Sequence, residues 1–195
     1  MKYIKKLYDW VLNWAETPYA VPALFLLAFT ESSFFPVPPD VLLITLSLSI
    51  PKKAFKYALL CTFGSIVGGM FGYFIGYQLM DLIGIPILNF YGAMEKYEYI
   101  RALYTKYDAW AVGIAAFTPI PYKVFTIAAG AFKIDFVVFV LASIAGRAGR
   151  FFLVAGFIYL YGPSIKDFID KYFNLLTFAF FVLLILGFLL MKYAF

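Results

Sequence analysis

The chain has 195 residues, of which 64% are hydrophobic and 14% charged, and its mean hydropathy is +0.87. An average soluble domain is about 45–50% apolar and about 25% charged, so this composition excludes a soluble fold and predicts an integral membrane protein. The lack of His and the single Cys61 exclude a Cys/His zinc site, a His-dependent nucleophile and a disulfide framework. We therefore predict neither an enzyme nor a bound metal or cofactor.

The net charge of +5 arises from short clusters of basic residues that flank apolar segments. Such clusters are typical of membrane topology signals and of contacts with anionic lipids, so nucleic acid is not a predicted partner. Their distribution satisfies the positive-inside rule for a multi-pass protein with its N-terminus in the cytoplasm. The clearest clusters are Lys2, Lys5 and Lys6, followed by Lys52, Lys53 and Lys56.

Residues 1–18 carry apolar side chains at helical spacing, which predicts an amphipathic helix lying in the membrane interface. Residues 20–50 contain two apolar runs, each shorter than the roughly 20 residues that a helix needs to cross the hydrocarbon core. A proline-rich stretch separates the runs, so we predict a re-entrant hairpin. Asp40 follows this stretch and is expected to cap the second helix. The breaking prolines are Pro36, Pro38 and Pro39.

Residues 52–80 are predicted to form a transmembrane helix, because no charged residue occurs from Tyr57 to Met80. Glycine at every fourth position predicts a groove for close helix packing, either within the chain or in a homo-oligomer. Residues 81–108 are polar, and we expect an interfacial loop with a short helix. The groove glycines are Gly64, Gly68, Gly72 and Gly76.

Residues 109–132 repeat the first design, because two short apolar runs flank a break at Pro119 and Pro121. A second re-entrant hairpin is therefore predicted. Further transmembrane helices are predicted at 135–162 and 171–192. The whole chain thus forms one all-α membrane domain of two inverted repeats, each a re-entrant hairpin followed by a transmembrane helix. An interfacial helix precedes the repeats and a transmembrane helix follows them.

Ionisable residues at membrane depth cost at least about 2.5–3.5 kcal/mol each on insertion scales, so they persist where they are paired or functional. The acids lie in the first hairpin and the bases in the second repeat. Arg147 and Arg150 stand one helical turn apart, so both guanidinium groups lie on one face and can bind a phosphate. The residues concerned are Glu31 and Asp40, and Lys123, Arg147 and Arg150.

Two interpretations of these charges are possible. In the first, the arginines neutralise the carboxylates and hold the hairpins together as fixed architecture. In the second, the bases bind an anionic headgroup, and one carboxylate exchanges a proton. Desolvation favours a neutral carboxyl group and a neighbouring arginine favours the carboxylate, so the two states can be balanced. Glu31 is the stronger candidate, since Asp40 also has a capping role.

Both hairpin motifs resemble those of the DedA family, whose shared region is the VTT domain. The stretch ESSFFPVPPD at 31–40 resembles the family's first hairpin, and FTPIPYK at 117–123 resembles the second. The stretch GRAGRF at 146–151 resembles the small YqaA-type branch. Most members have Arg where this chain has Ala116 and Tyr122. They also have Asn and Trp where this chain has Ser143 and Arg150.

The resemblance implies lipid translocation, because family members are linked to moving undecaprenyl phosphate or phospholipids across the bacterial membrane, often with dependence on the proton-motive force. Implied partners are membrane lipids with an anionic phosphate headgroup, and protons. A passive scramblase and a membrane-organising scaffold with structural ion pairs are the alternatives. Basic charge has moved from the second hairpin to the helix that follows, so the substrate site is expected to differ from that of other members.

Overall fold

A computed structural model describes residues 19–35, 37–118, 120–162 and 164. Within these ranges the chain is helical apart from short connections, as predicted, and it contains no strand. The predicted interfacial helix at 1–18, the predicted transmembrane helix at 171–192, and residues Pro36 and Pro119 lie outside the described residues.

Short helices occupy the two segments predicted as hairpins, and long helices occupy 52–80 and 135–162. Two helical stretches are long and apolar enough to cross a membrane, namely Pro51–Phe90 and Phe136–Tyr161. In chain order, the elements are α2 (Ala20–Ser33), α3 (Asp40–Ser49), a 3₁₀ turn (Pro51–Lys53), α4 (Ala54–Leu79), a π-helical turn (Met80–Gly84), α5 (Ile85–Phe90), α6 (Met94–Lys106), α7 (Asp108–Phe117), α8 (Tyr122–Ala131) and α9 (Phe136–Tyr161).

Residues 81–108 contain more helix than the predicted loop with a short helix. The chain continues from α4 through the π-helical turn into α5, and α6 follows after a brief turn. Pro86 follows the π-helical turn directly, and the wider turn before it accommodates a proline ring and its missing N–H group within a continuous helix. On α6, Arg101 forms an exposed ion pair with Glu98 on the preceding turn, at 3.4 Å.

The ends of the short helices follow from local sequence. Pro121 has an extended ψ of 97°, which separates α7 from α8. Pro39 immediately precedes α3 and is buried. Asp135 begins α9 by accepting hydrogen bonds from the backbone N–H groups of Val137 at 2.8 Å and Val138 at 3.0 Å. We call 34–39 the first break and 118–121 the second break.

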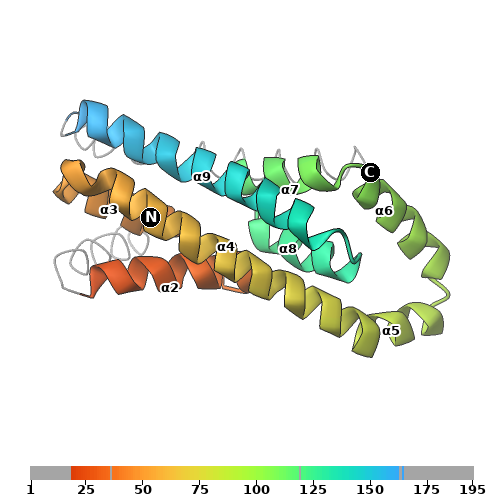
Figure 1. Cartoon of the computed structure of the whole chain (residues 1–195). Helices are drawn as coiled ribbons and strands as arrows, with labels where there is room; N and C mark the ends of the chain where they lie inside the picture. The colour runs from red at the N-terminus through yellow and green to blue at the C-terminus, as the bar shows by residue number, and fades with distance from the viewer. Residues whose placement is uncertain (1–18, 36, 119, 163, 165–195) are drawn as a thin grey trace.

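The two long helices α4 and α9 run antiparallel along the molecule (Figure 1). The α2–α3 pair lies toward one end of them and the α7–α8 pair toward the other, so that the two breaks approach each other near the middle. Helix α2 packs on α4, and α7 packs correspondingly on α9. Helix α8 also packs on α4, and α3 contacts both long helices. Each helix pair is therefore clamped between both long helices.

The glycine groove on α4 is filled by helices of the same chain. A Cβ atom on Gly68 would overlap the backbone of Phe29 in α2, and one on Gly76 would overlap the backbone of Ile127 in α8. The contact with α8 is reciprocal, because a Cβ atom on Gly130 would overlap the carbonyl of Tyr73 in α4. The groove therefore packs within one chain, as one of the two alternatives predicted.

Replacement of Gly76 by alanine is expected to destabilise the protein by roughly 1–3 kcal/mol, because α4 and α8 must separate to admit the methyl group. Gly156→Ala in α9 is the matched control, since its Cβ atom would meet nothing within 4 Å. We expect this control to be neutral or stabilising by up to about 1 kcal/mol through helix propensity. Thermal unfolding in detergent measures both; equal melting temperatures for the two variants would contradict the close packing.

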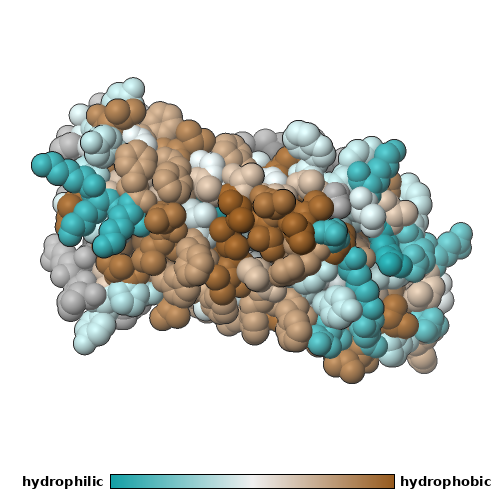
Figure 2. Space-filling view, in the orientation of Figure 1, coloured by the Kyte–Doolittle hydropathy of each residue, from teal (hydrophilic) through white to brown (hydrophobic). Residues whose placement is uncertain are grey.

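The surface matches an apolar solvent. Figure 2 shows a hydrophobic band across the middle of the visible face, with hydrophilic residues gathered toward both ends. Large apolar side chains stay exposed on both long helices, for example Leu59 at 61% and Leu141 at 60%. A bilayer flanked by water on both sides accounts for this pattern, because exposed apolar surface of this extent marks contact with lipid or another apolar partner. The chain is a helical membrane protein.

Candidate functional site

A polar layer separates two apolar cores. One core lies among α2, α3, the first half of α4 and the end of α9, and the other lies among α7, α8 and the first half of α9. Buried polar side chains occur where the two meet. Buried polar groups are costly unless hydrogen-bonded, so such a concentration needs an explanation. The members that carry the site are Ser32, Ser65, Thr126, Ser143 and Arg147.

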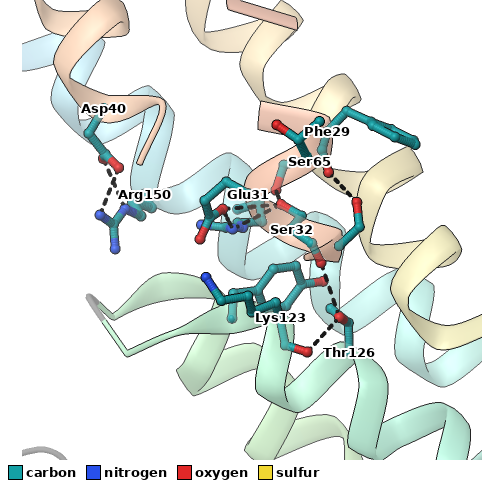
Figure 3. Close-up of polar contacts among 12 residues, drawn as sticks. Phe29, Glu31, Ser32, Asp40, Ser65, Lys123, Thr126 and Arg150 are labelled. Atoms are coloured by element: carbon teal, nitrogen blue, oxygen red, sulfur yellow. Dashed lines mark hydrogen bonds and ion pairs between the residues drawn. The ribbon is translucent and has the colours of Figure 1, made fainter. Parts of the chain in front are cut away.

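Arg147 is the centre of this layer, and its side chain is only 3% exposed. Its Nη2 forms an ion pair with Glu31, whose side chain is 12% exposed, and donates to the hydroxyl of Ser32 at 3.0 Å (Figure 3). The guanidinium lies over the ring of Tyr122, 4.2 Å from its centroid, with the ring of Phe151 at 5.4 Å. Its Nε–H finds no partner among the described residues.

Hydroxyl groups extend this network between the two helix pairs. The hydroxyls of Ser32 and Ser65 are 2.6 Å apart, and Thr126 in α8 donates to the backbone carbonyl of Ser32 at 3.0 Å. Tyr122 donates to Ser143 in α9 at 2.5 Å. Apart from Tyr122 and Ser143, which were noted only as departures from the family pattern, these residues were missed by sequence reasoning. The sequence feature that could have identified them is a Ser or Thr within an otherwise apolar helix.

The glycine row also contributes to the network. Gly72 leaves room for Thr126, because a Cβ atom there would overlap the threonine hydroxyl. The neighbouring Gly69 faces the hydroxyl of Tyr122, 3.0 Å from where its Cβ atom would lie. Glycine on α4 therefore serves the polar layer as well as helix packing.

Arg150 forms a second, more accessible ion pair. Its Nε and Nη2 donate to the two oxygens of Asp40 at 3.1 and 3.0 Å, a bidentate contact, and its Nη1 donates to the carbonyl of Thr118 at 2.7 Å. The two side chains of the pair are 18% and 17% exposed. The expected capping role of Asp40 is wrong: α3 begins at Asp40 and has no side-chain cap, because this carboxylate binds the arginine instead.

Lys123 projects from α8 toward the first break, where its Nζ donates to the carbonyl of Phe35 at 3.2 Å. It has no carboxylate partner among the described residues. Lys123 and Arg150 therefore each bind a backbone carbonyl of a helix break. Such a neutral acceptor is a weaker partner for a cation than an anion would be.

The structure thus gathers all five predicted charged residues where the two breaks meet. Three cations face two carboxylates, which leaves one positive charge unbalanced. Of the predicted break residues, Pro39 and Pro121 directly precede α3 and α8, and Pro38 is exposed between the helices. Among the described residues, no group of His, Cys, Asp or Glu could hold a metal ion. The unbalanced positive charge makes the site suited to binding an anion.

A separate charged contact braces the far end of α4. Lys133, which connects α8 to α9, binds both oxygens of Asp81 at 2.7 and 2.9 Å. This hydrogen bond with Asp81 raises the pKa of Lys133 above its ordinary value. Tyr97 and Arg101 of α6 bind the backbone carbonyls of Ala131 and Phe132, respectively. These contacts hold α6 against the end of α8 and are remote from the polar layer.

The fold is that of a helical membrane protein in which two broken helix pairs pack between two long helices, with charged residues at the breaks. Comparison with known proteins identifies the family. The sequence pattern of the VTT domain matches residues 37–160. The chain therefore belongs to the VTT-domain, or DedA, family of membrane proteins, in agreement with the resemblance of its hairpin motifs.

Two relatives are similar over most of the chain. An "Uncharacterized protein" of Haemophilus influenzae is 33% identical over 192 residues, which cover 98% of this chain and 100% of that protein. An "Uncharacterized protein HI0703 homolog" of Histophilus somni is 35% identical over 154 residues, which cover 79% of this chain and 80% of that protein. No solved structure shows a significant match to the chain.

Proposed function

We propose that this protein moves a phosphate-bearing lipid across the inner membrane and that a proton is coupled to the movement. In this proposal α2–α3 and α7–α8 are re-entrant hairpins of two inverted repeats, and the N-terminus is cytoplasmic. The packing of the helix pairs supports the inverted repeats, because α2 packs on α4 in the way that α7 packs on α9. Broken helices that meet at one polar site are typical of transporters.

The observation that carries the proposal is the unbalanced cation where the breaks meet. Apart from the ion pair between Arg150 and Asp40, Lys123 and Arg150 bind only neutral backbone carbonyls. A lipid phosphate can replace these carbonyls with stronger, charge-assisted bonds. Undecaprenyl phosphate and phospholipids both supply such a headgroup.

The exposures of the two arginines separate their roles. Arg147 is almost fully shielded and already bound to Glu31, so it positions the layer. Arg150 remains accessible and can share its guanidinium between Asp40 and a phosphate. Protonation of Asp40 weakens its ion pair with Arg150 and releases that guanidinium to the headgroup, whereas protonation of Glu31 loosens the polar layer that Arg147 positions. Glu31 and Asp40 are the groups through which a proton gradient would act.

Lipid movement in proteoliposomes under an imposed pH gradient tests the proposal. A panel that includes undecaprenyl phosphate and several phospholipids would name the substrate. We expect the gradient to accelerate lipid movement by the wild-type protein. Glu31→Gln should abolish this acceleration, although it preserves a hydrogen-bond acceptor for Arg147. Glu98→Gln on the exposed face of α6 is the control, and we expect it to behave as wild type.

Other outcomes would favour the alternatives. Both carboxylates are already paired with arginines, which is the observation that supports a passive scramblase or a scaffold with structural ion pairs. Rapid movement of many lipids without a gradient would indicate a scramblase. No lipid movement by a correctly folded protein would indicate a scaffold. Unchanged gradient dependence in Glu31→Gln would remove Glu31 from the coupling mechanism.

A further inference from the structure

A groove of about 670 Å³ lies between α7 and α9. Its volume falls within the roughly 300–1,000 Å³ that is typical of ligand sites. Small residues, including Gly113, Ala142 and Gly146, form part of its lining, together with the larger side chains of Trp110 and Leu141. Apart from Thr118, the residues that line it are apolar or glycine. The groove is therefore suited to a hydrocarbon occupant.

One end of the groove reaches the charged site. Thr118 lines the groove and also accepts a hydrogen bond from Arg150 through its carbonyl, at 2.7 Å. Helix α7 has 10 residues, which corresponds to about 15 Å of helix, or about half of a 30 Å hydrocarbon core. Trp110 marks the other end of the groove and is 74% exposed. The groove thus extends from the charged site along α7, a helix whose length is close to the thickness of one leaflet.

We propose that this groove binds one hydrocarbon chain of the phosphate-bearing lipid, with the headgroup at Lys123 and Arg150. The inference rests on the proposed function, which it deepens by assigning a site to the lipid tail. An occupant that is apolar along its length and anionic at one end complements both the lining and the unbalanced cation. The apolar segment 171–192 complements only the lining, because its charged residues, Lys171 and Lys192, are both basic.

Fluorescence quenching of Trp110 by brominated lipids tests this site. The full chain with Trp10→Phe and Trp14→Phe retains Trp110 as its one tryptophan. It is reconstituted in phosphatidylcholine vesicles that contain a minor fraction of an anionic lipid, phosphatidylglycerol, brominated at mid-chain. We expect stronger quenching than with the same fraction of brominated phosphatidylcholine, and reversal by unbrominated phosphatidylglycerol. Lys123→Gln should remove this difference between the two lipids.

A groove-filling variant provides the matched control. At Gly113 the nearest atom to an added Cβ is the carbonyl oxygen of Ala142 at 3.9 Å, so Gly113→Leu is expected to fold and to fill the groove. Gly156→Leu adds the same side chain on α9 where nothing lies within 4 Å of the Cβ atom. We expect the preference for phosphatidylglycerol to be lost in Gly113→Leu and retained in Gly156→Leu.

Equal quenching by the two brominated lipids, in the protein with native Lys123 and Gly113, would overturn the inference. The absence of quenching by either lipid would also overturn it, because it would show that protein covers the groove. Lipid movement is measured in the same vesicles to separate the two proposals. Movement without selective quenching would leave the proposed function intact and refute the groove. Selective quenching without movement would support the groove and refute lipid transport.

Discussion

Replacement of Arg147 by methionine is expected to lower the free energy of unfolding by roughly 3–5 kcal/mol, because it leaves the Glu31 carboxylate buried without its cation. Methionine has a similar length and retains apolar contact with the ring of Tyr122, so the expected loss reports mainly on charge. Thermal unfolding in detergent tests this prediction, with the melting temperature and the helix content as the measured quantities.

Two further variants make this result specific. Glu98→Gln neutralises one partner of an ion pair whose side chains are 41% and 54% exposed, so we expect a cost of only about 0–1 kcal/mol. Combining Glu31→Leu with Arg147→Met removes both buried charges, and we expect the double variant to recover much of the stability lost in the single variant. A cost for Arg147→Met no greater than that for Glu98→Gln would contradict a supporting role for the buried pair.

Replacement of Arg150 by glutamine is expected to reduce lipid movement at least tenfold while leaving the fold intact. The partly exposed pair of Arg150 and Asp40 contributes less to stability than the buried pair, but it supplies the accessible guanidinium for the phosphate. A tenfold effect corresponds to about 1.4 kcal/mol, close to the lower end of the roughly 1.5–3 kcal/mol that a hydrogen bond to a charged group contributes. The rate of lipid movement in proteoliposomes measures this loss.

The geometry of the side chain at this position also matters. Arg150→Lys keeps the charge but cannot reproduce the planar bidentate contact, so we expect an intermediate rate. Lys96→Gln removes an exposed positive charge on α6, outside the charged site, and should leave the rate unchanged. Equal rates for Arg150→Gln and Lys96→Gln would exclude Arg150 as a headgroup ligand.

Asp40 shows why one local expectation from sequence failed. A carboxylate directly after two prolines has the sequence pattern of a helix cap. In the folded chain, however, both of its oxygens bind Arg150, a residue 110 positions away. A guanidinium with two donors in one plane is a stronger partner for a carboxylate than a single backbone N–H group. Local sequence contains no information about such a distant competitor.

Residues 81–108 show a similar limit at the level of secondary structure. Their charges and tyrosines indicated an interfacial loop with a short helix, yet the chain is largely helical from 80 to 106. Polar character indicates exposure to water but does not distinguish a loop from an exposed helix. Tyr97 and Arg101 stand one turn apart and bind the end of α8, which stabilises the helical form. That stabilising contact depends on a partner distant in sequence.

The sequence by itself determined the class of the protein, because a high apolar content, short apolar runs and proline breaks constrain a chain in a bilayer independently of its tertiary contacts. It also placed acids in one half and bases in the other. Only the tertiary structure decided which arginine binds which acid, that Arg147 is shielded while Arg150 is accessible, and that hydroxyl groups from four helices complete the layer. The reason is physical: ion-pair partners and burial depend on how distant segments pack, and the pairs here join residues 116 and 110 positions apart.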